Sequence, residues 1–434
     1  MTGVSQQTGI RDPGSRGSNN TSLKGRLRKA TPAALLHRPY RVFWSGAVLS
    51  TMGSQFTIVA MAWQMYELTD SPLQVGLIGL ARAIPQSTML LLGGLLADAV
   101  DRRRMLLCLQ VAQCLISLTL AVLSATGMVT PVALYGATGL LALCTALENP
   151  ARQSLVPSLV PRSSLTSALA LNVSQGKVAT IVGPSLAGLL LAFSSSAWCY
   201  AVDACSWFGM LTAVLLVVPK AIPGSMRGAV SFRALGEGLG FVWHHPVMAS
   251  LLALDLVANL FGQPRALLPV YARDILNVGP AGLGLLYAAT AAGSLTVAIL
   301  LSVMGQVRRP GLCVILGLGV FGLGTVLFSI STIFWVSVLF LAIAGAGDTF
   351  SAVVRGTINQ LSVSDELRGR AMSVSSIFSS SGPQFGQFRG GIVAEAWGPV
   401  ESGVSGGIIV LFVCGLTTLS RRVRSYEYSQ AVGG

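Results

Sequence analysis

The strongest candidates for chemistry in this sequence are charged side chains that lie inside long apolar runs. They are few, because only 10% of the 434 residues are Asp, Glu, Lys or Arg, whereas 52% are hydrophobic. A charge at the centre of a lipid bilayer costs about 2.5–3.5 kcal/mol on insertion scales, so a charge kept in such a run is a candidate for function. The candidate proton or substrate site comprises these charges and two nearby amides: Arg82, Asp203, Asp255, Asn259, Gln263 and Arg265.

Two carboxyl groups in this set could carry protons. Burial disfavours the charged form of an acid, so Asp203 and Asp255 are the preferred proton carriers. The alternative for any single residue is a structural pair, such as an arginine held by an aspartate and by carbonyl oxygens. Three further charges lie in similar surroundings, Lys177, Asp348 and Arg389. A set of this size favours a role in proton or substrate binding for some of its members.

A second group of charges forms a short knot in the stretch GGLLADAVDRRRMLL, residues 93–107. Asp98 lies where a helix should end, so it can pair with Arg102 one turn later or cap the start of another helix. Gly94 would allow two helices to approach closely. For the arginines alone, a simpler interpretation is that they only fix the orientation of the chain in a membrane.

The elements that position these residues are long apolar stretches. A helix needs roughly 20 apolar residues to cross the hydrocarbon core of a bilayer, and only helices or closed barrels satisfy the backbone there. The stretches lack the sustained alternation of barrel strands. The sequence therefore predicts an all-α membrane protein with twelve transmembrane helices, at about 41–66, 72–97, 104–126, 131–149, 165–194, 197–218, 247–271, 281–304, 311–330, 333–354, 371–396 and 402–420.

The positive charge of the chain is unevenly distributed along it. Net charge is +13, and 24 of the 29 basic residues lie in the two tails or in the loops after even-numbered helices. The odd-numbered loops hold one basic residue, Arg273. The positive-inside rule then predicts a multi-pass protein of the cell membrane with both termini in the cytoplasm, and it accounts for the basic excess without nucleic acid.

The chain divides into two similar halves. We expect a disordered basic tail at 1–40, six helices within 41–218, a cytoplasmic linker with an interfacial segment at 219–246, six more helices within 247–420 and a tail at 421–434. The motif GPSLAG, which begins at Gly183, has a counterpart in GPQFG, which begins at Gly382. Parallel six-helix repeats are a known transporter plan, with the substrate site between the halves.

The charge knot resembles the loop signature between helices 2 and 3 of the major facilitator superfamily, G-x-x-x-D-R-x-G-R-R/K. Here Ala99 replaces the first basic residue and Asp101 replaces the second glycine. The D-R-R-R form is similar to that of the enterobactin-exporter and macrolide-efflux branch. Further segments that resemble this branch are ENPARQSLVPSLVPRSSLTSALALN, VGPSLAGLLLA and DELRGRAMSV, so the resemblance extends over residues 40–420.

The resemblance implies roles for several residues. It implies that Asp98 locks helix 2 against helix 11 when the cytoplasmic side is closed, and that Glu148 is a partner acid at the end of helix 4. The cytoplasmic gate would then consist of Gly94, Asp98, Asp101, Arg102, Arg103, Glu148 and Arg152. The residues Gly183, Pro184 and Gly188 resemble a helix-5 motif of exporters. The alternative for that motif is a packing kink with no bearing on the direction of transport.

The sequence also departs from well-marked drug/proton antiporters. Those have an arginine in the middle of helix 4 and often an acid in helix 1. The stretch 131–147 has no charge, and the membrane part of helix 1 offers only glutamines as polar candidates of similar size. Coupling through another carboxylate, or transport without protons, both stay open.

The leading hypothesis is a secondary-active exporter of small amphiphilic molecules that works by alternating access and is coupled to protons. The alternatives are a dedicated siderophore exporter, an importer, or a non-export facilitator or sensor of the same fold. An enzyme is disfavoured because the sequence has no H-E-x-x-H, G-x-S-x-G or phosphate-binding P-loop motif. We expect no metal, cofactor or nucleic-acid partner, and a monomer in the lipid bilayer.

Overall fold

The computed structural model describes residues 32–97, 102–217, 240, 246–303, 309–361, 365–420 and 424. Within these ranges every regular element is a helix. Most of the predicted tails, at 1–40 and 421–434, and most of the predicted linker, at 219–246, lie outside the described residues.

Six long helices form the first half of the molecule. A short 3-10 turn, η1 (Ala33–Leu36), precedes them, and a second, η2 (Arg162–Ser164), leads into α6. Proline or a hydroxyl cap marks several of the starts, as at α5, where Thr130 accepts a hydrogen bond of 3.2 Å from the amide of Ala133. The six helices are α2 (Arg38–Thr69), α3 (Pro72–Ala97), α4 (Arg102–Ala125), α5 (Pro131–Leu159), α6 (Leu165–Phe193) and α7 (Ser196–Leu216).

The second half also has six crossings, but its first crossing is broken. α9 (Pro246–Phe261) ends before Pro264, which has no amide hydrogen to continue the helix. The crossing resumes as three short turns, η3 (Arg265–Leu267), α10 (Leu268–Val270) and η4 (Tyr271–Ile275). The other five crossings are α11 (Gly279–Val303), α12 (Pro310–Ile330), α13 (Phe334–Leu361), α14 (Asp365–Trp397) and α15 (Pro399–Leu419).

The described chain therefore makes the twelve crossings that the apolar pattern predicts. Eight of its helices, α4 to α7, α11 to α13 and α15, are long and apolar enough to cross a membrane on length and composition alone. Large apolar side chains project outward from these helices, including Phe193, Val303 and Leu419. The all-α, two-half architecture is confirmed.

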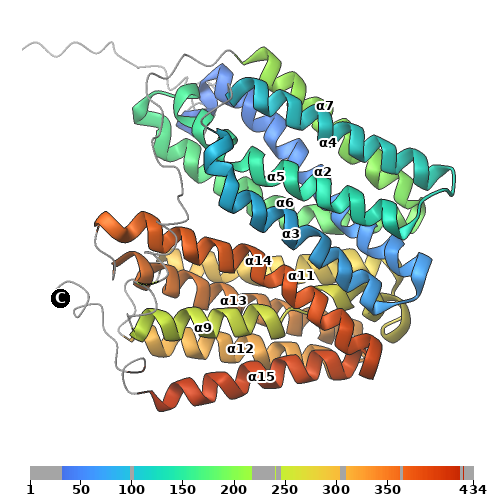
Figure 1. The fold of residues 1–434 in the computed structure, drawn as a ribbon, viewed down its shortest axis with the longest axis vertical. Helices are drawn as coiled ribbons and strands as arrows, with labels where there is room; N and C mark the ends of the chain where they lie inside the picture. Colours follow the sequence, from blue (N-terminus) through green and yellow to red (C-terminus); the bar gives the residue numbers. More distant parts are fainter. Residues whose placement is uncertain are drawn as a thin grey trace, which may run out of the picture.

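The two halves lie side by side in Figure 1, with α2 to α7 in the upper half of the view and α9 to α15 in the lower half, and they come together toward the right. Two helix pairs form most of the interface, α3 with α14 and α6 with α11. We call the end where α2 begins and α15 ends the terminal end, on the left in Figure 1. The opposite end, where the α2–α3, α4–α5, α6–α7, α12–α13 and α14–α15 connections lie, is the odd-loop end.

The two interface pairs meet through matching glycines. A Cβ added at Gly188 of α6 would lie 2.8 Å from the Cα of Gly284 in α11. A Cβ added at Gly391 of α14 would lie 2.8 Å from the Cα of Gly76 in α3. In each pair the partner glycine follows a proline by four residues, so α3 and α11 present the same P-x-x-x-G surface. The duplication seen in the sequence thus extends to the interface between the halves.

Candidate functional site

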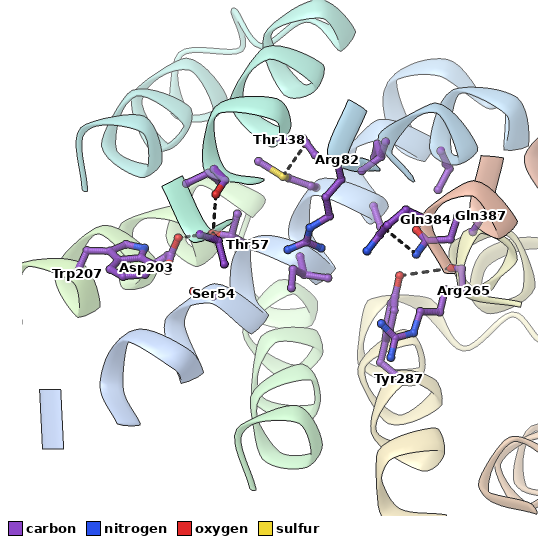
Figure 2. Close-up of a pocket in the computed structure, with 18 residues that line it drawn as sticks. Ser54, Thr57, Arg82, Thr138, Asp203, Trp207, Arg265, Tyr287, Gln384 and Gln387 are labelled. Atoms are coloured by element: carbon purple, nitrogen blue, oxygen red, sulfur yellow. Dashed lines mark hydrogen bonds between the residues drawn. The ribbon is translucent and has the colours of Figure 1, made fainter. Parts of the chain in front are cut away.

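A pocket lies between the two halves, and we call it the central pocket. The first half contributes α2, α3, α5 and α7, and the second contributes η3, α11 and α14. Figure 2 shows the polar side chains around it. Three of the predicted site residues, Arg82, Asp203 and Arg265, line this pocket, together with Ser54, Thr57, Ile58, Met61, Ala62, Val75, Ile78, Thr138, Leu141, Thr145, Trp207, Ala266, Tyr287, Gln384 and Gln387.

The two arginines reach the pocket from different halves. Arg82 lies on α3 one turn before Pro85, and Arg265 begins η3 directly after the break in the seventh crossing. Within the described part of the chain, neither guanidinium lies within ion-pair distance of a carboxylate. Beside them lie the Tyr287 hydroxyl, which donates to the backbone oxygen of Arg265 at 3.4 Å, and two amides of α14, Gln384 and Gln387.

Asp203 is held by hydroxyl groups. Its carboxylate oxygen Oδ2 accepts hydrogen bonds of 2.7 Å from Thr57 on α2 and 2.7 Å from Ser117 on α4. Ser206 lies 3.5 Å from the other oxygen. The side chain is buried, and no cation of the described residues pairs with it. Asp203 is therefore a carboxyl group with several neutral hydrogen-bond donors.

Asp255 belongs to a separate cluster and does not line the central pocket. Its Oδ1 forms an ion pair with Nη2 of Arg355 at 2.7 Å and accepts a hydrogen bond of 2.8 Å from Nδ2 of Asn259. The hydroxyl of Ser379 lies 3.3 Å from Oδ2. Gln263 joins the cluster weakly, 3.5 Å from Asn259. The predicted set thus divides into two groups. Arg355, which follows the predicted span 333–354, lies inside α13.

The predicted cytoplasmic gate is described in part. Asp98 and Asp101 lie outside the described residues, Gly94 lies in α3, and α4 begins at Arg102. Arg103 donates to the backbone oxygen of Leu215 at 3.0 Å. The lock between Asp98 and helix 11 stays a prediction.

The acid predicted at the end of helix 4 is buried within the first half. Glu148 is 2% exposed and lies 3.5 Å from Arg152 on the same helix. Gln113 of α4 donates to its other oxygen at 3.1 Å. Arg152 also lines a second, polar space between α2, α5 and α6. These contacts join α4 and α5 next to that space.

The helix-5 motif lies at two helix contacts. α6 continues as a helix through Pro184. A Cβ added at Gly183 would lie 2.6 Å from the Cβ of Gln55 in α2, and Gly188 meets α11 across the interface. The motif therefore joins α6 both to its own half and to the other half.

A charged cluster at the odd-loop end was not among the predicted site residues. Arg273 pairs with Asp70 at 2.7 Å and lies over the ring of Tyr66, whose hydroxyl donates to Asp274. Ser71 donates to Glu395 at 2.8 Å. We call the cluster of Tyr66, Asp70, Ser71, Arg273, Asp274 and Glu395 the odd-loop latch. A signal was present in the sequence, because Arg273 is the one basic residue in the odd-numbered loops.

Arg389 illustrates the structural alternative for a charge in an apolar run. Its Nη1 donates to the backbone oxygens of Ser402 and Phe261 at 3.3 and 3.4 Å, and its Nη2 donates to Ser405 at 3.1 Å. The side chain ties α14 to α9 and α15. Arg82 and Arg265 lack such ties in the described structure, which sets them apart.

Comparison with known proteins agrees with this architecture. The profile of the transmembrane secretion effector family matches residues 29–432. The enterobactin exporter EntS of Shigella boydii serotype 18 is 27% identical over 381 residues, which cover 87% of this chain and 90% of the relative. EntS of Salmonella choleraesuis strain SC-B67 is 26% identical over 390 residues, covering 87% and 93%.

Solved structures share the fold at low identity. A bacterial homologue of the human lysosomal transporter Spinster has a TM-score of 0.69 at 14% identity, covering 89% of this chain and 98% of that one. The nucleoside transporter NupG has a TM-score of 0.67 at 13% identity, covering 92% and 100%. Since the family profile spans nearly the whole chain, this protein belongs to the transmembrane secretion effector family of major facilitator superfamily transporters.

Proposed function

We propose that the protein is a proton-coupled exporter of small amphiphilic molecules that works by alternating access. The observation that carries the proposal is the central pocket, whose polar and apolar walls come from both halves of a duplicated bundle. A site between two repeats becomes accessible from alternate sides when one half rocks against the other.

The closed odd-loop end supports the alternating-access step. The odd-loop latch and the two glycine pairs join the halves between the pocket and this end. Each charged contact is modest, because Arg273 and Asp70 keep 38% and 72% of their side chains exposed. Contacts of this strength hold one state of a two-state equilibrium without making it permanent.

Asp203 supports the proton step better than Asp255 does. The hydroxyls around Asp203 can donate to a carboxylate, and they can rotate to accept from a protonated carboxyl. Asp255 is held in an ion pair with Arg355 at 2.7 Å, so taking up a proton would break that pair. We therefore assign the coupling proton to Asp203, and we assign to Asp255 a structural role between α9, α13 and α14.

The relatives suggest the first substrate to test. Those compared are named enterobactin exporters, and the apolar wall of the pocket suits an amphiphilic molecule. The test uses everted membrane vesicles that contain the full chain, with labelled enterobactin and a panel of labelled amphiphilic drugs. We expect accumulation driven by an inwardly acidic gradient and abolished by an uncoupler. Equal accumulation in vesicles that lack the protein, for every compound, contradicts the proposal.

The cytoplasmic gate is tested in the same vesicles. Asp98→Asn removes the charge that the resemblance assigns to the lock, so it should reduce transport severalfold while the protein still inserts. Glu67→Gln, at an exposed position of the odd-loop end, is the matched control. Wild-type rates in Asp98→Asn would remove Asp98 from the gate.

A further inference from the structure

We propose that the central pocket selects organic anions and that it binds the acidic group of the substrate between Arg82 and Arg265. This inference rests on the proposed function, because it takes the central pocket as the substrate site. It adds the charge class of the substrate, which neither the family nor the fold fixes.

The first argument is that neither arginine forms an ion pair in the described chain, although the carboxyl of Asp348 acts on Arg265 from beyond ion-pair distance. Arg82 and Arg265 line one pocket, and their positive charges act on each other. Guanidinium groups in a membrane protein normally find a carboxylate or several carbonyl oxygens, as Arg389 does. For these two, no carboxylate of the described chain lies within ion-pair distance. An anion between them would satisfy both.

The one acid of the pocket does not fill this role. Asp203 directs Oδ2 at the hydroxyls of Thr57 and Ser117, each at 2.7 Å. Figure 2 shows Asp203 beside Trp207, on the far side of Thr57 from Arg82. The pocket thus has a hydroxyl-bound acid on one side and two arginines on the other.

The groups near the arginines suit an oxyanion. Gln384 and Gln387 carry amide donors on α14, and Tyr287 carries a hydroxyl on α11. Arginine presents a planar fork of donors that matches carboxylate, sulfonate, phosphate or catecholate oxygens, and charge-assisted bonds of this kind are the strong ones. Apolar side chains, including Met61, Ile78 and Leu141, also line the pocket. The pocket therefore fits an acidic head and an apolar body.

The placement of the arginines also links binding to the conformational change. Arg82 belongs to the first half and Arg265 to the second. Repulsion between them opposes close approach of the halves, and an anion that contacts both removes this repulsion. Substrate binding would then favour the state in which the halves meet around the pocket.

The experiment compares three probes with the same dansyl body on the purified full-length protein in nanodiscs. Dansylglycine is anionic, dansylamide is neutral and dansylcadaverine is cationic. We expect the wild type to bind dansylglycine at least about tenfold more tightly than the other two, the contribution of one charge-assisted hydrogen bond. Arg82→Gln and Arg265→Gln should each remove most of that preference, and Arg→Lys at either position should retain part of it.

The matched control is Arg162→Gln, an exposed position at the terminal end outside the pocket, which should keep the wild-type preference. Thermal unfolding of each variant shows whether it is folded. Equal affinity for the three probes, no binding of dansylglycine, or an unchanged preference in both pocket variants overturns the inference.

Transport of the same probes into proteoliposomes separates this inference from the proposed function. Arginine-dependent binding of the anion without any transport would leave the inference standing and contradict the exporter. Transport that ignores probe charge and both arginines would contradict the inference and leave the exporter standing.

Discussion

Gly391→Ala should open the odd-loop end, because the added methyl has no room in the closed interface. A Cβ at this position would lie 2.7 Å from the backbone oxygen of Pro72 and 2.8 Å from the Cα of Gly76. Both partners are backbone atoms of α3, so neither can move aside as a side chain could. The neighbouring Gly390 is the matched control, because the nearest atom to a Cβ there is the backbone oxygen of Gln263 at 3.9 Å.

The size of the effect follows from the packing. Extra carbon atoms forced into a well-packed contact cost about 1–3 kcal/mol. The methyl penalises only the state in which α3 and α14 touch, so the whole cost appears in the equilibrium between closed and open states. A difference of this size changes that equilibrium by about 5–150-fold. Gly390→Ala should leave the equilibrium within about twofold, because 3.9 Å is an ordinary van der Waals distance and the added methyl meets no closer atom.

The assay measures the distance between spin labels at Met128→Cys and Trp335→Cys. These positions lie at the odd-loop end in different halves, and each is 69% exposed. The seven native cysteines are first replaced. Three of them are buried, but the four that are at least partly exposed would also take the spin label. We expect Gly391→Ala to gain a longer-distance population that Gly390→Ala lacks. Identical distance distributions in two folded variants would refute the packing argument.

Three other substitutions test the charged groups. Arg273→Gln should change the equilibrium between closed and open states by at most about fivefold, which is less than Gly391→Ala does. The reason is that its pair with Asp70 is exposed and worth about 0.2–1 kcal/mol. Asp255→Asn should lower the stability against thermal unfolding by about 3–5 kcal/mol, because it leaves Arg355 buried and unpaired. Adding Arg355→Met should recover most of this loss, and no recovery would contradict the pairing. Asp203→Asn should preserve substrate exchange and remove its dependence on the pH gradient, and an unchanged pH profile in everted vesicles would exclude Asp203 as the proton carrier.

The sequence predicts the number and length of the crossings well because hydrophobic length alone determines them. It predicts their continuity less well. The stretch 247–271 has one apolar pattern, yet the helix breaks before Pro264, and this break places Arg265 at the pocket. The apolar pattern ends the tenth span at 354 and leaves Arg355 outside it, whereas the helix continues to Leu361 and buries this residue.

The candidate site is predictable only where charge stands out against its surroundings. Arg82, Arg265 and Asp203 are visible as charges in apolar runs, and all three line the central pocket. Tyr287 and Gln384 are not visible in this way, because a polar residue on a helix can face a neighbour, the pocket or lipid, and only the packing of the halves decides which. Asp255 carries an equally clear sequence signal and lies in a different cluster.

The closed end combines two kinds of contact that differ in their physical strength. The odd-loop latch consists of exposed charges, which salt and water weaken. The glycine pairs bring backbones together, and such contacts tolerate no added atom. Shape should therefore determine how closely the halves meet, while the charges adjust the equilibrium between states. Because Arg82 and Arg265 repel each other across the same interface, the occupant of the pocket adds a third contribution, and an anion is the occupant whose charge has the favourable sign.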